Sequence, residues 1–516
     1  MDRRRFLRLA GIAGVGVIAG CVTPRSTSSP TPTGSPTASA SPTASASPSP
    51  TATARPPDWE ALARALRGEL VRPSSPAYDT RRVLYNTRFD TIRPQGVARC
   101  ASADDVRECV AFASSTGVPL ALRSGGHSYG GWSTGVGLVI DTGPLNAVAV
   151  SADRVVVGAG ARLIDVYAKT ASAGAGVPGG SCATVGIAGL ALGGGIGVMS
   201  RVWGLTCDDL LAAEVVTADG KLLTCDEQRE PDLFWALRGG GGSFGAVTSL
   251  TLRTHAASVL ALGFLSWPWS AANAVIAAWQ TWMGEAPDAL WSNLHLDADR
   301  SGAQLTLYAV HSGTIASLDA HLDRLDALSG VRANRSVGSR SFMDTMLVDA
   351  GCLGRTVSQC HLAGDTPDGA LQRETYAAKS IVATAPLSTA TIAALTDGLV
   401  GPIEGDSHSV IFDGLGGAVA RLAADATAFP HRGAAGVLQF VQSWAAGATV
   451  AQTQFRAYHD RIRALAGPAA YANYADPDLA DWQGAYYGAN YARLQRVKRA
   501  YDPKELFTFP QAIRPA

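Results

Sequence analysis

Apolar and polar residues alternate along the first half of the chain in patterns that predict short helices and strands. Apolar residues recur at helical spacing over Trp59–Arg72 and again over Asp104–Ser115, where Ser102 is a suitable N-cap. A short strand within PLALRSGGH then leads into a glycine-rich loop. Strand and helix patterns alternate in the two segments that follow, 137–150 and 155–174. These patterns predict an α+β domain in which loops that follow strands carry a ligand.

The middle of the chain predicts a second domain. Strand alternation is clear in QLTLYAV (304–310) and SVIFDGL (409–415), and helical stretches at 319–328 and 391–399 separate such strands. The chain after its N-terminal region is about 460 residues long, too long for one hydrophobic core. We therefore predict two domains. The first is formed by 58–255 plus 469–516, and the second, 256–468, is built on an antiparallel sheet.

The N-terminal segment belongs to neither domain. DRRRFLR (2–8) places paired arginines before Phe-Leu, and the apolar stretch that follows is too short for a permanent membrane span. Paired arginines of this kind are typical of a twin-arginine export signal, and VIAGC (17–21) is typical of a lipoprotein signal in which Cys21 carries the lipid. An uncleaved anchor is the alternative. We expect residues 1–21 to direct export to the cell surface, or secretion.

A tether follows the signal. Residues 22–57 are almost entirely Ser, Thr, Pro and Ala, and they cannot bury enough apolar surface to offset their chain entropy. At about 3 Å per residue, such a Pro-stiffened segment reaches roughly 100 Å. We predict a disordered linker between the membrane and the folded domains.

Charge and cysteine spacing exclude several classes of protein. The chain has 43 basic and 43 acidic residues, so no nucleic-acid surface is expected and the N-terminal lipid is the one membrane contact. The eight cysteines match no metal-ligand spacing, and no metal is expected. Cys352 and Cys360 are close enough in sequence to pair outside the cytoplasm, with buried thiols as the alternative. We expect a monomer.

Two glycine-rich stretches carry the candidate chemistry. LRSGGHSYGGW (122–132) contains His127, and VPGGSCATVGIAGLALGGGIG (177–197) contains Cys182. Glycines let backbone amides approach a ligand closely and form anion-binding loops. One nucleophilic side chain within each loop favours a cofactor that is both cradled and covalently held. Two glycine-rich turns with unrelated His and Cys residues are the alternative.

These motifs resemble a known family. Five stretches carry the resemblance: RSGGHSYGG, the later GxC–TVG–GL–LGGGxG pattern, VVTADG (215–220), DLFWALRGGGGSFGAVTSLTLR (232–253) and NYADPDLADW (473–482). They resemble FAD-linked oxidases of the berberine-bridge-enzyme and oligosaccharide-oxidase type. These belong to the vanillyl-alcohol-oxidase superfamily and have a PCMH-type FAD-binding domain. The resemblance runs from about Tyr85 to the C-terminus. It implies FAD attached through its 8α-methyl to His127 and through C6 to Cys182.

The resemblance and the glycine pattern together give the cofactor-binding candidates. Backbone amides of both loops are the expected donors to the diphosphate. Because the pattern is not the GxGxxG fingerprint of a Rossmann fold, NAD is not expected. We interpret DLFWALRGGGGSFG as a glycine-rich turn beneath the cofactor domain, and not as a third phosphate loop. The resemblance implies that Tyr487 and Asn490 of the tail lie near the isoalloxazine. The candidates are Arg123, Ser124, Gly125, Gly126, His127, Ser128, Cys182, Val185, Gly186, Gly189, Gly194, Gly195, Val216, Tyr487 and Asn490.

A flavin enzyme that oxidises a hydroxyl group needs a base for the hydroxyl proton. The resemblance implies that Tyr474 is this base, as in the sugar oxidases, with Tyr471 as second choice. It also implies that Tyr129 lines the substrate face and that Asp413 is a carboxylate that holds and polarises the tyrosine. Core packing with a satisfied hydroxyl is the alternative for each tyrosine.

Gln439 marks a departure from the family pattern. The bridge-forming alkaloid enzymes place a glutamate base at this position, and an amide cannot replace that base. We therefore do not expect berberine-type ring closure, and we keep Gln439 as an active-site candidate. Ala183 replaces a usual proline and Leu190 replaces a histidine frequent in plant members, but neither change removes an attachment atom.

The sequence thus predicts an exported FAD-dependent oxidase that acts on a hydroxyl group of a sugar or oligosaccharide. Hydride would pass to flavin N5, and O2 would be reduced to hydrogen peroxide. One alternative is oxidation of a secondary metabolite with another electron acceptor. A second, from a different class, is a non-catalytic surface lipoprotein that binds a saccharide.

Overall fold

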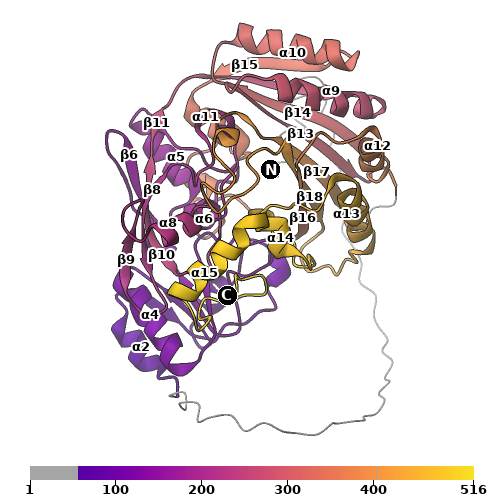
Figure 1. The fold of residues 1–516 in the computed structure, drawn as a ribbon. Helices are drawn as coiled ribbons and strands as arrows, with labels where there is room; N and C mark the ends of the chain where they lie inside the picture. Colours follow the sequence, from indigo (N-terminus) through magenta and orange to yellow (C-terminus); the bar gives the residue numbers. More distant parts are fainter. Residues whose placement is uncertain (1–55, 402–403) are drawn as a thin grey trace, which may run out of the picture.

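A computed structural model describes residues 56–401 and 404–516 of the chain. The predicted signal (1–21) and nearly all of the predicted linker (22–57) lie outside these residues. The described part combines helices with three larger sheets (Figure 1), and the α+β prediction is confirmed.

The first half of the chain forms two of these sheets. In the four-stranded sheet, ordered β1-β2-β4-β3, the central strand β4 pairs in parallel with both β2 and β3. The five-stranded sheet, ordered β5-β6-β10-β8-β9, is antiparallel throughout. A separate two-stranded sheet pairs β7 with β11. The elements of this half of the chain are α2 (Trp59–Ala65), β1 (Glu69–Val71), α3 (Tyr78–Arg81), β2 (Gly96–Arg99), α4 (Ala103–Thr116), β3 (Leu120–Arg123), β4 (Leu138–Asp141), β5 (Val148–Val150), β6 (Arg154–Gly158), α5 (Leu163–Ser172), β7 (Ala175–Gly176), α6 (Ile187–Leu192), α7 (Ser200–Trp203), β8 (Leu210–Val216), β9 (Leu222–Cys225), α8 (Pro231–Leu237), β10 (Ala246–Arg253) and β11 (His255–Ala256).

The first helix is shorter than its apolar spacing predicted. Helix α2 ends at Ala65, because the chain turns where the amides of Arg67 and Gly68 donate to the carboxylate of Asp105, at 3.0 and 2.9 Å. A side chain at Gly68 would collide with the carbonyl of Arg99, so β1 can follow at once beside β2. The second predicted helix is confirmed as α4.

The middle of the chain forms a seven-stranded antiparallel sheet, as predicted. The strand order is β15-β12-β14-β13-β17-β18-β16. Its elements are β12 (Leu260–Trp267), α9 (Ala272–Glu285), β13 (Leu290–Asp299), β14 (Gly302–His311), α10 (Ile315–Ser329), β15 (Asn334–Arg340), α11 (Phe342–Asp349), β16 (Tyr376–Ala383), α12 (Thr389–Asp397), β17 (Ser407–Gly414), β18 (Gly436–Ser443) and α13 (Thr453–Ala466).

The two faces of this sheet differ in chemistry. Helices α9, α10, α12 and α13 lie along this sheet (Figure 1). Leu294, Phe412 and Leu438 pack with these helices into one apolar core. Because successive strand residues point to opposite faces, their neighbours Asp413 and Gln439 lie on the other face. The sheet therefore presents polar side chains on the face away from these helices.

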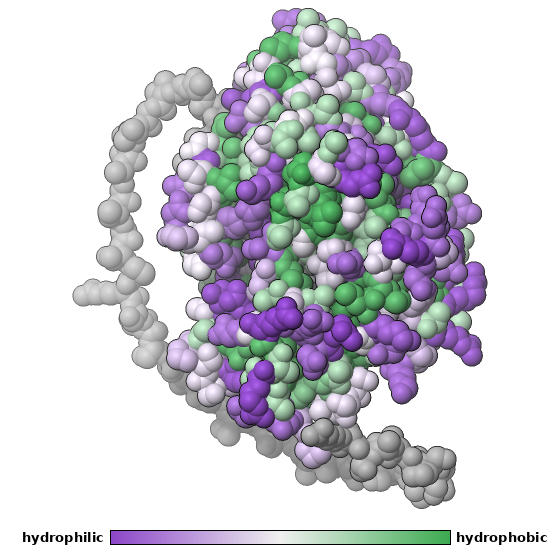
Figure 2. Space-filling model, turned by 90° about the vertical axis from the view of Figure 1, so that its left-hand side faces the viewer, coloured by the Kyte–Doolittle hydropathy of each residue, from purple (hydrophilic) through white to green (hydrophobic). Residues whose placement is uncertain are grey.

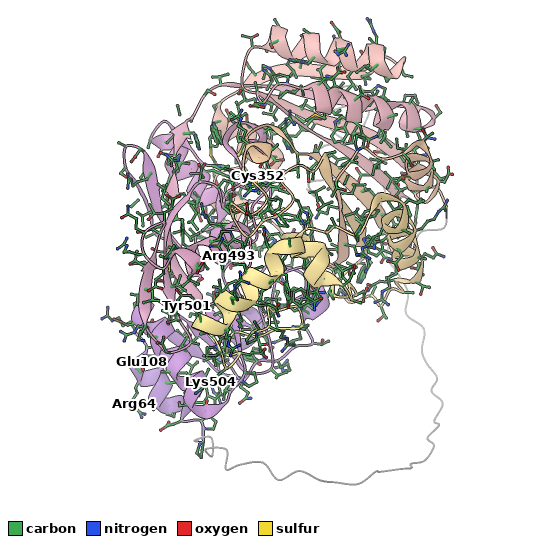
Figure 3. The ribbon with its side chains drawn as sticks, viewed as in Figure 1. Arg64, Glu108, Cys352, Arg493, Tyr501 and Lys504 are labelled. Carbon is green, nitrogen blue, oxygen red and sulfur yellow. A yellow bond between two sulfur atoms is a disulfide. The ribbon has the colours of Figure 1, made fainter. Side chains whose placement is uncertain are left out.

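The C-terminal tail returns to the first half of the chain. It contains α14 (Trp482–Tyr487) and α15 (Tyr491–Tyr501), and α15 lies against α8 (Figure 1). Arg493 of α15 lies over the ring of Trp235 at 4.1 Å and pairs with Asp232 at 2.6 Å. Figure 3 labels Arg493 and Tyr501 along this helix.

Among the cysteines, Cys352 and Cys360 form a disulfide, so the first of the two interpretations of this pair holds. Cys100, Cys109, Cys207 and Cys225 are buried thiols, whereas Cys182 is half-buried.

Within the described residues no helix has the length and apolarity needed to span a bilayer. On the face shown in Figure 2, apolar side chains gather in the middle between polar borders.

Candidate active site

The first glycine loop starts where β3 ends, and Arg123 anchors it. The Arg123 guanidinium donates to the carbonyls of Arg81 and Arg82 and to the carboxylate of Asp141, at 2.7, 3.2 and 3.2 Å. Its side chain is therefore used within the protein and does not line the cavity described below. The Arg123 side chain therefore fixes the loop that follows it, and a contact between Arg123 and the cofactor stays a prediction.

The two glycine loops contact each other directly. A side chain on Gly125 would lie 2.1 Å from the amide nitrogen of Gly186, and one on Gly186 would lie 2.0 Å from Ser124 Oγ. The Ser124 hydroxyl also donates to the carbonyl of Ala159 at 2.6 Å. Glycine is required at both positions, because only bare backbone allows the loops to meet.

Both loops line one cavity of about 300 Å³, a volume typical of small-molecule sites. The sheet contributes Gln439 and the C-terminal tail contributes Tyr474 and Tyr487. The predicted site residues that line it are Ser124, Gly125, Gly126, His127, Ser128, Tyr129, Cys182, Val185, Gly186, Gly189, Gln439, Tyr474 and Tyr487. Segments far apart in sequence thus bring both nucleophiles and three of the predicted tyrosines to the same cavity.

Gly194, Gly195 and Tyr471 do not line this cavity. The amide of Gly195 donates to the Tyr471 hydroxyl at 2.8 Å, and the amide of Gly194 donates to the carbonyl of Ala191. The Asn473 side chain also donates to the Tyr471 hydroxyl, at 2.9 Å. Both amides and the Tyr471 hydroxyl therefore have partners within the chain, and the roles predicted for these three residues stay predictions.

Val216 and Asn490 also lie outside the cavity. Val216 is fully buried at the end of β8, in an apolar core with Val106 and Phe507. The Asn490 side chain donates to the carbonyls of Ala424 and Thr427, at 2.7 and 3.2 Å. Val216 thus belongs to the core and the Asn490 side chain makes a loop contact, and the cofactor contacts predicted for both residues stay predictions.

His127 is held on two sides. Its Nε2 lies 2.8 Å from the hydroxyl of Thr184, and the Tyr85 ring stacks on the imidazole with centroids 4.0 Å apart. Burial, together with the positive charge of Arg162, lowers the pKa of His127 to about 3. The imidazole is therefore neutral at physiological pH, which is the form that can act as a nucleophile.

A cluster of tyrosines forms the other side of the cavity. Tyr129 and Tyr474 are stacked with centroids 5.5 Å apart, and Tyr376 meets Tyr129 edge-on at 5.4 Å. The Gln439 amide donates to the Tyr129 hydroxyl, so this glutamine orients a cavity tyrosine. This side of the cavity is therefore aromatic, and it carries the hydroxyls of Tyr129 and Tyr474 and the amide of Gln439.

Asp413 acts on Tyr474 from behind the cavity. Burial raises the pKa of Tyr474 well above its usual value, and the negative charge of Asp413 raises it further. The Asp413 carboxylate accepts a hydrogen bond from the Asn293 amide at 3.2 Å and does not itself line the cavity. Tyr474 therefore keeps its proton at neutral pH beside a carboxylate.

Several lining residues were missed by sequence reasoning. Gly241 and Gly242, from the stretch interpreted as a turn beneath the domain, line the cavity beside Tyr487. Asn473 and the aromatic pair Trp132 and Phe509 also line it, and these two rings are stacked at 5.1 Å. The four-glycine run was a usable signal for the first pair. No local signal marks Phe509, which arrives from the end of the chain.

The cavity fits FAD by its own geometry. Among the described residues no acceptor takes the backbone amides of Gly125, Gly126 and His127, which are the donors that a diphosphate requires. Side chains added at Gly189 or Gly242 would meet no atom within 4 Å, so bare backbone borders open space there. The Ser133 hydroxyl lines the cavity, is buried and has no partner within the described part of the chain.

No group of three or more metal-binding side chains occurs within residues 56–401 and 404–516. The residues that converge on the cavity are instead a histidine, a cysteine, tyrosines and amides, which suit an organic cofactor.

Comparisons with known proteins identify the family. The family model described as "FAD binding domain" matches residues 94–226, and the one described as "Berberine and berberine like" matches residues 470–514. An FAD-linked oxidoreductase of Bacillus subtilis, YgaK, is 30% identical over 461 residues, which cover 87% of this chain and 97% of the relative. A xylooligosaccharide oxidase of Thermothelomyces thermophilus is 29% identical over 456 residues, covering 82% and 88%.

Solved structures agree with this assignment. The glucooligosaccharide oxidase of Acremonium strictum superposes with a TM-score of 0.81 at 25% identity, covering 89% of this chain and 99% of that enzyme. The chain has the PCMH-type FAD-binding fold and belongs to the FAD-linked oxidoreductases of the berberine-bridge-enzyme-like family. It is an FAD-dependent oxidoreductase with a small-molecule substrate.

Proposed function

We propose that this protein oxidises a hydroxyl group of a sugar or oligosaccharide and reduces O2 to hydrogen peroxide. The observation that carries the proposal is the convergence of His127, Cys182 and Tyr474 on one cavity, with Asp413 behind the tyrosine. Oligosaccharide oxidases among the relatives support the substrate class. In this proposal, segments 58–255 and 469–516 hold the cofactor and 256–468 holds the substrate.

We assign His127 and Cys182 as the two attachment points for FAD, through the 8α-methyl and C6. The Acremonium enzyme is described as carrying a 6-S-cysteinyl, 8α-N1-histidyl FAD, which supports this assignment. The first loop would bind the diphosphate through its unused amides, and neutral His127 is in the state that attachment requires.

Bound FAD would supply a hydride acceptor at N5. The chain itself must take the proton of the substrate hydroxyl, and Tyr474 is the cavity group suited to this task. Because burial and Asp413 keep its phenol protonated, Tyr474 can accept a second proton only as it releases its own. Asp413 is the base to which we assign that released proton. Gln439 holds Tyr129 in place against Tyr474.

We further propose export by the twin-arginine route and a lipid anchor at Cys21, on the basis of the N-terminal motifs. The Cys352–Cys360 disulfide is consistent with a destination outside the cytoplasm. Replacing the paired arginines Arg3 and Arg4 with lysine should retain flavin-loaded protein in the cytoplasm. Replacing Cys21 with alanine should release the protein from membranes.

The decisive experiment has two stages. First, the protein is precipitated with acid, and flavin that stays in the pellet is measured for the parent, His127→Ala, Cys182→Ala and the double variant. We expect loss of pellet flavin only in the double variant. Second, the parent is screened with xylo-, gluco- and chito-oligosaccharides for coupled O2 consumption and peroxide formation. Flavin reduction without O2 uptake would favour another electron acceptor, and reduction by no saccharide would refute the substrate class.

A further inference from the structure

The side chain of Thr184 contacts His127, and the proposed function gives this contact no role. It is buried, at 3% exposure, and its hydroxyl lies 2.8 Å from Nε2 of His127. The Tyr85 ring covers one face of the imidazole, with the ring centroids 4.0 Å apart and an 18° angle between the ring planes. The ring is thus fixed by a hydrogen bond at one nitrogen and by stacking on one face.

The backbone around Thr184 is fixed as well. The carbonyl of Ala183 accepts from the amide of Ile164 at 3.1 Å, and the carbonyl of Val185 accepts from the amide of Leu163 at 2.9 Å. Both neighbours of Thr184 are therefore tied to the start of α5. The threonine hydroxyl occupies a set place, and it can hold the histidine that it contacts.

This contact distinguishes the two nitrogens of His127. Whichever tautomer is present, Nε2 is engaged by Thr184, and Nδ1 is the nitrogen left for another partner. A hydroxyl can accept a hydrogen bond from Nε2–H while Nδ1 carries its lone pair. It can also donate to Nε2 after Nδ1 has formed a bond to carbon. Threonine therefore fits His127 both before and after alkylation at Nδ1.

We propose that Thr184 is a positioning residue that directs attachment of the flavin to Nδ1 of His127. This inference rests on the proposed attachment at His127. Overall, one imidazole N–H and one C–H of the 8α-methyl group are replaced by the new N–C bond. The two hydrogens and the electron pair pass to O2, the oxidant of the proposed reaction, as hydrogen peroxide.

The test uses a Cys182→Ala background, in which His127 is the one remaining attachment point. Thr184→Val preserves the shape of the side chain and removes the hydroxyl, whereas Thr184→Ser keeps the hydroxyl. Each apo-protein is mixed with FAD in air, and acid-stable flavin is followed over time. We expect the serine variant to match its parent, and the valine variant to attach flavin about two- to tenfold more slowly, the loss typical of one hydrogen bond. In a variant that attaches flavin slowly, protein-bound flavin that acid releases shows that the cofactor site has folded.

A second measurement reports the attached atom. The flavin peptide is isolated from each variant, and NMR determines whether Nδ1 or Nε2 carries the 8α-carbon. We expect Nδ1 in the parent and the serine variant, with Nε2 appearing in what the valine variant forms. Equal rates and a pure Nδ1 product in the valine variant would overturn the proposed role of Thr184. They would leave the proposed attachment at His127 in place. Absence of acid-stable flavin from the Cys182→Ala parent would instead overturn the attachment at His127, and with it this inference.

Discussion

The rings of Tyr129 and Tyr474 stack in the cavity with their planes 7° apart, although one belongs to the first glycine loop and the other to the C-terminal tail. The short turn that carries Tyr474 (Ala472–Tyr474) is fixed to β16 through Ser380, whose hydroxyl donates to the carbonyl of Tyr474 at 3.3 Å. The cofactor loop, the sheet and the tail thus jointly set the position of the proposed base.

Replacing Tyr474 with phenylalanine should remove the proton acceptor and leave the cofactor site intact. We expect kcat to fall by about 10²–10⁴-fold, the usual contribution of a general base, with no change in acid-stable flavin. Anaerobic flavin reduction by the best substrate from the screen measures the step directly. Tyr458→Phe is the matched control, because Tyr458 is also a buried tyrosine of raised pKa but donates to the carbonyl of Leu395, in the helix-side core. Equal rates in both variants would exclude Tyr474 as the base.

Asp413→Asn should change the pH dependence of the reaction. In the proposed relay, Asp413 takes the phenol proton, so reduction by the parent would not require the phenolate. Without that acceptor only the phenolate can act, and the rate should rise about tenfold per pH unit below the pKa of Tyr474. That pKa should also be lower than in the parent, because the negative charge that raises it is gone. A flat profile with unchanged kcat in Asp413→Asn would contradict the relay.

Gly189→Leu should empty the cofactor site without unfolding the protein. Gly189 lies in α6, and a side chain there meets no protein atom within 4 Å, so leucine would extend into the cavity. We expect the ratio of flavin to protein to fall to near zero while circular dichroism stays unchanged. Gly284→Leu in α9 is the control, since it is also a helical glycine with open space and lies outside the cavity lining. Normal flavin content in Gly189→Leu would place the cofactor elsewhere.

The parts of the site that could be predicted from sequence are those that a local motif determines. The two glycine-rich loops predict a cofactor-binding site with two nucleophiles, His127 and Cys182, because glycine density and a reactive side chain are local features. Gly125 and Gly186 behave as the motif implies. The tail tyrosine Tyr474 was found through resemblance, since without the resemblance core packing is the favoured interpretation.

The contacts that could not be predicted are those with partners that are distant in sequence. Nothing in LGGGIG shows that the amide of Gly195 is already bonded to Tyr471 from the tail. Likewise, the carbonyls that accept from Asn490 come from a loop more than sixty residues away. The end of α2 depends on the Asp105 carboxylate, which the helical spacing of the first helix cannot reveal. Periodicity and motifs report what a segment prefers, whereas these contacts depend on which other segment occupies the adjoining space.

The final prediction concerns the buried ion pair that joins the sheet to the tail. Lys379 of β16 lies 2.6 Å from Asp476 and 2.9 Å from Asp478, and the Lys379 and Asp476 side chains are 4% and 3% exposed. Lys379→Met would leave the Asp476 carboxylate buried without its cation. Removing one partner of a buried pair costs about 3–5 kcal/mol. We expect a loss of this order in urea unfolding, with part of it regained in Lys379→Met/Asp476→Asn, because the second change removes the uncompensated charge.

Arg456→Met provides the control within the same network. Arg456 pairs with Asp478 at 2.9 Å, but both side chains are about half exposed, at 50% and 42%. Solvent screens such a pair, and its loss should cost only about 0–1 kcal/mol. The Lys379 variant should also reduce flavin more slowly, because Lys379 adjoins Ser380, which holds the turn of Tyr474. If Lys379→Met unfolds at the same urea concentration as Arg456→Met, the ion pair does not hold the tail, and the backbone contacts of β16 alone position the base.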